Sequence, residues 1–242
     1  MSTPLLSIII PAYNEEQRIG STLEKVTAFL SMQDYRSEVL VVENGSQDRT
    51  LEIAQEFSAR YPWVHALHED GRGKGLAVRR GMLEAIGEYR FICDADLSMP
   101  IEEVNRFIPP LLADVEIVIG SREAPGAIRY NEPAFRHFTG RLFNWVVRLL
   151  ALPGLQDTQC GFKCFRAVVA EEIFPLQTIS GWTFDVEVLY IARRRGYHIV
   201  ELPIPWYYNA ESKVRVLHDL LKVGRDLIII RWNATRGRYN TP

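Results

Sequence analysis

The hydrophobic positions in the first half of the chain alternate between short continuous runs and segments with helical spacing. The runs are LLSIII (5–10), EVLVVE (38–43), a stretch near 63–68, YRFICDAD (89–96) and EIVIGS (115–120). Residues 17–31 and 48–60 carry apolar side chains at helical intervals, and a third helix is expected from the GRGKG turn (71–75) to about residue 87. Strands that alternate with helices at this spacing predict an α/β fold with a mostly parallel sheet built from βαβ units.

The second half is less regular. We expect an amphipathic helix over 134–150, a loop that enters a strand over 157–165, and a helix over 184–195. Residues 198–208 read as one strand, and their prolines indicate a sheet edge. A further amphipathic helix is expected from Lys213 onward. No linker interrupts the pattern, so the sequence predicts a single domain over residues 1–242.

Parallel sheets of this kind bind ligands at the carboxyl ends of their strands. Five polar segments follow predicted strands and are expected to converge on one edge: Pro11–Glu15, Glu43–Asp48, Gly71–Gly75, Asp94–Ser98 and Ser121–Arg122. The sharpest chemical signal among them is Asp94-Ala95-Asp96. Two carboxylates placed this close at the end of a buried strand repel each other, and a divalent cation relieves the repulsion. Oxygen ligands suit Mg²⁺ or Mn²⁺, so Asp94 and Asp96 are the candidate metal ligands.

Composition narrows the possible partners and compartments. The formal net charge is −2, which does not favour nucleic acid as a ligand. Three cysteines (Cys93, Cys160 and Cys164) make an odd count that favours a reducing compartment over a disulfide framework. The N-terminus lacks the pattern of a signal peptide, and no run of 18 apolar residues is present. We therefore expect a cytoplasmic protein, either free or peripheral on the cytoplasmic face of a membrane.

The ordered motifs resemble those of the family 2 glycosyltransferases, and most closely the dolichyl-phosphate glucose and dolichyl-phosphate mannose synthases. The matching segments are SIIIPAYNEE (7–16), VVENGSQDRT (41–50), GRGKGLAVRRGM (71–82), DADLSMP (94–100), GSR (120–122), DTQCGFKCF (157–165) and GWTFDVEVLY (181–190). The resemblance implies a GT-A fold with a Rossmann-like sheet. It also implies a nucleotide-sugar-binding half (1–122), an acceptor-binding half (123–212) and a C-terminal amphipathic helix (213–242).

The same resemblance assigns roles to individual residues. Those expected to bind the nucleotide-sugar donor are Pro11, Tyr13, Asn14, Glu15, Glu43, Gly45, Ser46, Asp48, Lys74, Asp94 and Ala95. Asp96 is expected to hold Mg²⁺ or Mn²⁺ against the diphosphate, with Asp94 completing the metal shell or touching the sugar. The family's usual pair of aspartates before Gly-Ser is replaced here by Glu43 and Asn44. UDP-glucose and GDP-mannose both stay open as donors.

The acceptor is expected to be a polyprenyl or dolichyl phosphate, reached by a hexosyl transfer with inversion. Arg122 and Arg136 are the candidate phosphate ligands, because guanidinium groups bind phosphate with two parallel hydrogen bonds. An anionic phosphate needs no strong general base, whereas a sugar hydroxyl does. For a hydroxyl acceptor the candidate bases are Asp157, Asp185 and Glu187, although Asp185 and Glu187 cannot both face one site.

Residues 213–238 combine seven basic side chains with apolar ones and a tryptophan, which is typical of a helix lying on an anionic membrane. The alternative is a helix docked on the core of the domain. Two other functions also remain open. One is transfer to a soluble sugar or polysaccharide hydroxyl, and the other is nucleotide-sugar binding without turnover.

Overall fold

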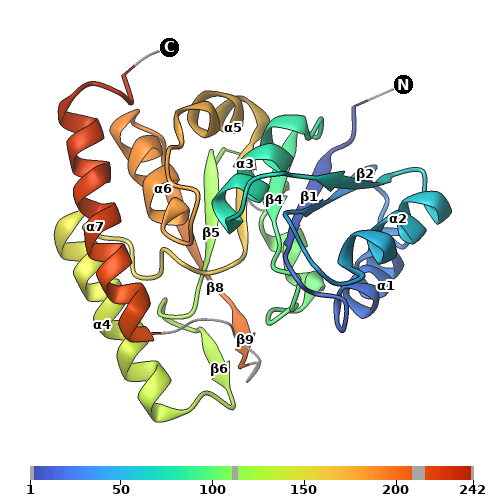
Figure 1. Cartoon of the computed structure of the whole chain (residues 1–242), viewed down its shortest axis with the longest axis horizontal. Helices are drawn as coiled ribbons and strands as arrows, with labels where there is room; N and C mark the ends of the chain where they lie inside the picture. The colour runs from blue at the N-terminus through green and yellow to red at the C-terminus, as the bar shows by residue number, and fades with distance from the viewer. Residues whose placement is uncertain (1–2, 111–113, 209–215, 241–242) are drawn as a thin grey trace.

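A seven-stranded sheet organises the chain, and a two-stranded sheet lies beside it (Figure 1). The computed structural model describes residues 3–110, 114–208 and 216–240. The strand order of the large sheet is β3-β2-β1-β4-β7-β5-β8, and β6 pairs with β9 in the small one. The strands are β1 (Leu6–Ala12), β2 (Ser37–Glu43), β3 (Val64–His68), β4 (Tyr89–Ile92), β5 (Ile117–Ser121), β6 (Ile128–Tyr130), β7 (Lys163–Arg166), β8 (Ile199–Pro203) and β9 (Pro205–Tyr207).

Helices connect and cover these strands. They are α1 (Ile19–Leu30), α2 (Thr50–Arg60), α3 (Lys74–Glu84), α4 (Ala134–Leu150), α5 (Ala167–Ile173), α6 (Phe184–Arg194) and α7 (Val216–Thr235), with short 3₁₀ turns η1 (Ile101–Arg106) and η2 (Phe174–Leu176). β1 pairs in parallel with β2 and β4, and β5 pairs in parallel with β8. Only β7 in this sheet runs antiparallel to its neighbours. The predicted α/β class with a mostly parallel sheet is confirmed.

The core has two layers because strand side chains alternate between the faces of the sheet. Leu6, Ile8 and Ile10 of β1 pack on one face with α1, α2 and η1. Ile9 points to the other face, which α3, α4, α5, α6 and α7 cover. Both faces are therefore filled, and the edge formed by the carboxyl ends of the parallel strands is left for a site.

Three sequence expectations need correction. The strand predicted over 89–96 ends at Ile92, because Asp94–Ser98 turn away from the sheet, with Leu97 at a positive φ of 43°. The strand predicted over 198–208 is divided at Ile204 into β8 and β9, which belong to different sheets. The helix expected to reach residue 87 ends at Glu84. Two further elements, α5 and β6, were not predicted from the sequence.

Candidate active site

The loops after β1 and β2 are tied to each other by hydrogen bonds. The Asn14 amide donates to Ser46 Oγ (3.0 Å), and Asn14 Oδ1 accepts from the Gln47 amide (2.8 Å). The Asp48 carboxylate accepts from the Glu16 amide (3.1 Å) and from both the amide and the hydroxyl of Thr50. Partial burial works to raise the pKa of Asp48, but these hydrogen bonds lower it overall. Asp48 thus braces the two loops and caps the start of α2.

Glu43 at the end of β2 is buried, and each of its two carboxylate oxygens makes a contact. One of its oxygens accepts from the Ser46 amide, and the other contacts Nδ1 of His68 at 2.6 Å. That hydrogen bond raises the pKa of His68, whose other ring nitrogen lies 3.2 Å from Asp70. Glu43 therefore stabilises the loop after β2 through its contacts with Ser46 and His68. The remaining residues assigned to the donor lie at the same edge, with Pro11 and Ala95 buried, Tyr13 exposed, and Glu15, Gly45 and Ser46 half-buried.

The acidic turn after β4 lies next to Lys74, the first residue of α3. The Lys74 ammonium is 2.6 Å from Asp94 Oδ1 and sits over the Trp182 ring at 4.8 Å. Burial works to lower the pKa of Lys74, yet the Asp94 and Asp185 carboxylates raise it above its usual value. The pKa of Asp94 is lowered, since Lys74, Lys163 and Arg122 together outweigh its desolvation. The structure brings Lys74 and Asp94 together in one ion pair.

The glycines around Lys74 serve packing. A Cβ on Gly75 would lie 2.6 Å from the Ile179 carbonyl oxygen, and a Cβ on Gly73 would overlap the Ser180 carbonyl. The Gly75 amide donates to the Ser180 carbonyl (2.8 Å). That amide is therefore not available to a phosphate.

Asp96 meets the requirements of a metal ligand. Its side chain is half-buried and accepts one hydrogen bond from the Ser98 amide (3.0 Å), and it pairs with no cation among the described residues. No group of three His, Cys, Asp or Glu side chains is gathered for a metal ion in the described part of the chain. Mg²⁺ is commonly held by one or two carboxylates together with substrate phosphates and water. Asp96, with Asp94 beside it, fits such a site.

A buried ion pair lies close to Asp94, and the sequence did not point to its cation. Lys163 on β7 is fully buried, and its ammonium is 2.7 Å from Asp185 Oδ1 and also donates to the Cys160 carbonyl. Desolvation raises the pKa of Asp185 despite Lys163 and Lys74. The available signal was a lysine enclosed by apolar residues in the segment GFKCF. Lys74, Asp94, Lys163 and Asp185 thus form a cluster of alternating charge.

Arg122 lies just past β5 and is held by Asp157. Its Nε and Nη2 bond the two carboxylate oxygens at 2.6 and 2.8 Å, and its amide bonds Oδ2 at 3.0 Å. Its guanidinium also lies over the Trp206 ring, 5.5 Å from the centroid. Desolvation of the fully buried Asp157 is outweighed by Arg122, which lowers the pKa of Asp157 to about 2. Such a weakly basic carboxylate is poorly suited to be a general base.

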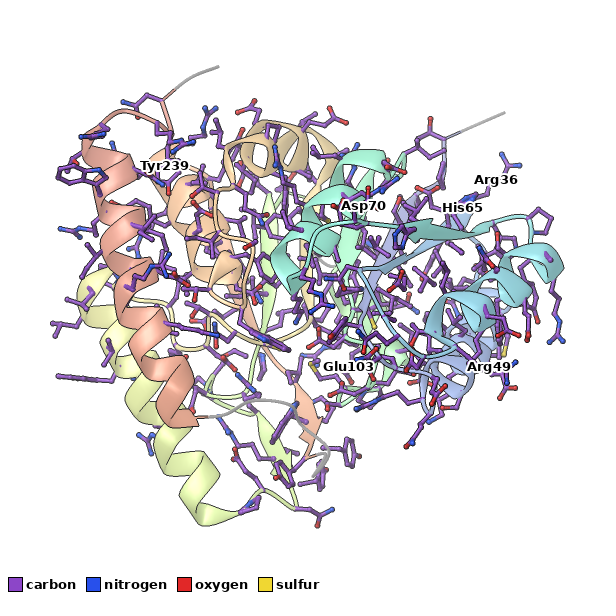
Figure 2. All side chains as sticks on the ribbon, in the orientation of Figure 1. Arg36, Arg49, His65, Asp70, Glu103 and Tyr239 are labelled. Carbon is purple, nitrogen blue, oxygen red and sulfur yellow. The ribbon has the colours of Figure 1, made fainter. Side chains whose placement is uncertain are left out.

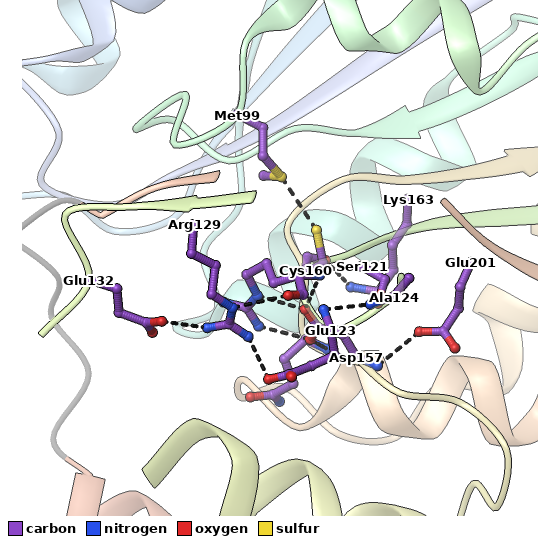
Figure 3. Close-up of polar contacts among 12 residues, drawn as sticks. Met99, Ser121, Glu123, Ala124, Arg129, Glu132, Asp157, Cys160, Lys163 and Glu201 are labelled. Carbon is purple, nitrogen blue, oxygen red and sulfur yellow. Dashed lines mark hydrogen bonds and ion pairs between the residues drawn. The ribbon is translucent and has the colours of Figure 1, made fainter. Parts of the chain in front are cut away.

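Further polar contacts hold this pair in place (Figure 3). The Glu201 carboxylate accepts from the amides of Gln156 (2.8 Å) and Asp157 (2.9 Å). Arg129 donates to the Arg122 carbonyl (3.0 Å) and to both Glu123 and Glu132. Arg122 therefore has a fixed position, with part of its guanidinium already occupied.

Two candidates remain: Glu187 for the general base and Arg136 for the acceptor phosphate. Glu187 accepts from Thr178, Ile179 and Tyr239, whose hydroxyl lies 2.7 Å away, so its partners differ from those of Asp185. Tyr239 is labelled in Figure 2 and follows α7. Arg136 lies in the first turn of α4, and its side chain is outside the described residues.

Comparisons with known proteins identify the family of the chain. The model of glycosyl transferase family 2 matches residues 7–174. The chain is similar to the dolichyl-phosphate beta-glucosyltransferases of Drosophila melanogaster (35% identity, 93% of this chain and 74% of the relative) and Saccharomyces cerevisiae (34%, 97% and 76%). Human dolichyl-phosphate beta-glucosyltransferase is 31% identical over 98% of this chain and 78% of its own length.

Solved structures share the fold at low sequence identity. Glucosyl-3-phosphoglycerate synthase from Mycobacterium tuberculosis in complex with phosphoglyceric acid superposes with a TM-score of 0.68 at 18% identity, over 99% of this chain and 81% of that one. The same enzyme in complex with Mn²⁺, UDP-glucose and glycerol 3-phosphate gives 0.65 at 18% identity, over the same shares of the two chains. These similarities confirm the predicted GT-A fold. With the family model matching most of its length, the chain belongs to glycosyl transferase family 2 and is a glycosyltransferase.

Proposed function

We propose that this enzyme transfers glucose from UDP-glucose to a polyprenyl or dolichyl phosphate, with inversion at the anomeric carbon and with Mg²⁺ or Mn²⁺ bound. The observation that carries the choice of acceptor is the state of Asp157 and Asp185, two of the three candidate bases. The third, Glu187, accepts hydrogen bonds from Thr178, Ile179 and Tyr239. Asp157 and Asp185 are buried and each pairs with a cation at 2.6–2.7 Å. Neither is placed to remove a proton from a sugar hydroxyl, whereas a phosphate acceptor is already an anion at neutral pH. This argues against the alternative acceptor, a soluble hydroxyl.

The donor is proposed to bind along the edge formed by the loops after β1, β2 and β4. Lys74 holds the diphosphate, and Asp96, with Asp94, holds the metal ion. Bound there, the cation would supply Lewis-acid stabilisation of the departing nucleoside diphosphate. Glucose is favoured over mannose by the names of the similar curated proteins. UDP is favoured over GDP by the UDP-glucose bound in the solved structure of glucosyl-3-phosphoglycerate synthase. GDP-mannose serves as the competing donor in the test.

The acceptor phosphate is proposed to meet Arg122 and Arg136. Arg122 has Nη1 left for a phosphate oxygen, since Nε and Nη2 hold Asp157. Its fixed orientation lowers the entropy cost of placing the nucleophile behind the anomeric carbon. Inversion then follows from a single displacement by a phosphate oxygen, which gives a β-linked product from an α-linked donor.

Two helices offer a surface for the membrane that carries such an acceptor. α7 is docked on the core through Val223, Leu227 and Ile230. Its other side exposes Ile228 and Trp232, and α4 exposes Trp145 and Leu149. We propose that this side lies on the cytoplasmic face of a membrane. No helix among the described residues is long and apolar enough to cross one. Lys213 and Arg215, part of the basic segment, fall outside the described residues.

The test is a release assay for nucleoside diphosphate, with UDP-glucose or GDP-mannose as donor and either a polyprenyl phosphate or free sugars as acceptor. We expect release from UDP-glucose only when the polyprenyl phosphate is present, and nuclear magnetic resonance of the product should show a β linkage. Transfer to soluble hydroxyls but to no lipid phosphate would contradict the proposed acceptor. Donor binding without any release would favour a binding protein.

A further inference from the structure

Trp182 is a large aromatic side chain in direct contact with the proposed donor site. It lies in the segment between η2 and α6, and 52% of its surface is exposed. The centroid of its ring is 4.8 Å from the ammonium of Lys74. The Lys74 side chain itself is only 12% exposed, so the ring lies over a cation that has little contact with water.

Backbone contacts hold the segment that carries Trp182 against the start of α3. The Gly75 amide donates to the Ser180 carbonyl (2.8 Å), and the Gln177 side-chain amide donates to the Gly75 carbonyl (2.8 Å). A Cβ at Gly75 would not fit between the two backbones. The position of the ring over Lys74 therefore follows from this close packing, and not from the side-chain contact alone.

The surroundings of the Lys74 ammonium leave part of it for a ligand. Among the described residues, the ammonium contacts the Asp94 carboxylate at 2.6 Å and the Trp182 ring. A lysine ammonium has three N–H groups, so one remains for a phosphate oxygen. Lysine is also a flexible side chain, and contacts on two sides restrict the directions in which its ammonium can point.

The two contacts differ in what they do to the charge of Lys74. The Asp94 carboxylate neutralises the ammonium and competes with an incoming phosphate for it. An aromatic face stabilises a cation through its quadrupole while the net positive charge remains. This attraction is strongest for tryptophan and increases where water is excluded, as it is around Lys74. The ring thus supports the cation without reducing its attraction for an anion.

We propose that Trp182 is a positioning residue for the donor diphosphate and acts by holding the Lys74 ammonium. This inference rests on the proposed function, in which Lys74 holds the diphosphate. Without the ring, Asp94 is the remaining partner of the ammonium, and the lysine is drawn toward the carboxylate. The nucleoside is assigned to the loops after β1 and β2, so its binding should not depend on Trp182.

The experiment measures the dissociation constants of UDP, UDP-glucose and uridine by titration calorimetry at one fixed Mg²⁺ concentration. Trp182→Leu keeps an apolar side chain but removes the aromatic face, and we expect it to weaken UDP binding about tenfold. Uridine binding should stay the same. Trp182→Phe should cause a smaller loss, since phenylalanine attracts cations less strongly than tryptophan. The matched control is Trp63→Leu, which lies just before β3, at the end of that strand away from the loops, and should not affect UDP.

A double-mutant cycle tests whether the ring acts through Lys74. In a Lys74→Gln background, Trp182→Leu should cause no further loss of UDP affinity, because the ammonium that the ring holds is absent. A tenfold loss in both backgrounds would mean that the ring acts independently of Lys74, and it would overturn the inference.

The outcomes separate this inference from the function on which it rests. A wild type that binds neither UDP nor UDP-glucose would contradict the proposed donor, and the role of Trp182 would fail with it. If the wild type binds both, an unchanged UDP affinity in Trp182→Leu, or an equal loss for UDP and uridine, overturns the role of Trp182 alone. A loss for UDP-glucose without a loss for UDP would also overturn it and would assign the ring to the sugar.

Discussion

At the scale of single residues, the site is built from charges that hold one another. Arg122 is assigned to the acceptor, yet two of its three guanidinium nitrogens bond Asp157. Lys74 is assigned to the donor, yet it pairs with Asp94. Each cation is thus oriented before substrate arrives, and little reorganisation is required when an anion binds.

Replacing Asp157 with asparagine should destabilise the fold by about 3 kcal/mol at neutral pH, because the partly buried Arg122 would lose its counter-charge. The pKa of Asp157 is about 2 in the folded state, below that of an unfolded aspartate. Its stabilising contribution, about 2 kcal/mol, is therefore present above pH 5 and lost as the pH falls toward 2. Urea unfolding of wild type and Asp157→Asn should show a gap in unfolding free energy that narrows over that range.

The matched control is Asp34→Asn, an exposed aspartate in the loop after α1, which should leave the unfolding free energy nearly unchanged. A gap between wild type and Asp157→Asn that stays constant from pH 7 to pH 2 would contradict the assigned cause.

Asp96→Ala should reduce turnover on the order of a thousandfold, since the diphosphate would lose several kcal/mol of cation stabilisation. The thermal unfolding midpoint should change little, because Asp96 makes one hydrogen bond and is not part of the core. Activity measured with and without a chelator provides the check. Full wild-type turnover in excess chelator would refute the metal requirement.

The residues that follow strands could be predicted from the sequence, whereas their mutual pairing could not. Asp94, Asp96 and Arg122 stand out because polar side chains directly after apolar runs mark the carboxyl ends of strands. Lys163 was missed because it lies inside a strand, and hydrophobic patterning does not predict the function of a charged residue there. Its partner Asp185 is distant in the sequence, so their pairing appears only in three dimensions.

At the scale of elements, hydrophobic runs located the strands, but two of the predicted strands extended too far. The β4 prediction ran on through Cys93 and Ala95, which are buried in the turn as well as apolar. The 198–208 run is interrupted only at Ile204, and hydrogen bonding reveals that β8 and β9 have different partners. α4 was predicted with its observed bounds, because its apolar spacing is sustained over four turns.

Gly75→Ala should destabilise the protein by about 1–3 kcal/mol and weaken donor binding. The new methyl would lie within 3 Å of the Ile179 carbonyl and of Phe184, so the start of α3 must move away from the 179–184 segment. Chemical denaturation and the KM for the donor measure the two effects. Gly181→Ala is the control, since a Cβ there meets nothing within 4 Å. Equal stability of the two variants would show that the close packing at Gly75 is unimportant.

At the scale of the whole molecule, the alternation of strands and helices predicted the class of the fold but not the order of its strands. β7 is inserted between β4 and β5, although it follows both in the sequence. No local pattern encodes that insertion, because it depends on how the second half of the chain folds back onto the first. The family resemblance supplied the GT-A architecture that hydrophobic patterning alone did not.

The outer side of α4 and α7 should bind anionic vesicles. Trp145 and Trp232 are 55% and 57% exposed, and Arg225 and Arg231 are exposed on α7. We expect co-sedimentation with vesicles containing phosphatidylglycerol to fall as salt screens the arginines. Trp145→Ala/Trp232→Ala should weaken the partitioning about tenfold. Val168→Ala, an exposed apolar position on α5, should have no effect. Equal binding of all three proteins would contradict this membrane surface.

The antiparallel strand β7 also sets the distance between the ends of β4 and β5. Neighbouring strands lie about 4.8 Å apart, so placing one strand between β4 and β5 separates their ends by roughly 10 Å. The acidic turn extends from one of these ends and Arg122 from the other. Backbone pairing therefore fixes the distance between the proposed donor site and the proposed acceptor site, across which the sugar is transferred. A glycosyltransferase built in this way can change its sugar or its acceptor by altering loops, while the reach between leaving group and nucleophile stays constant.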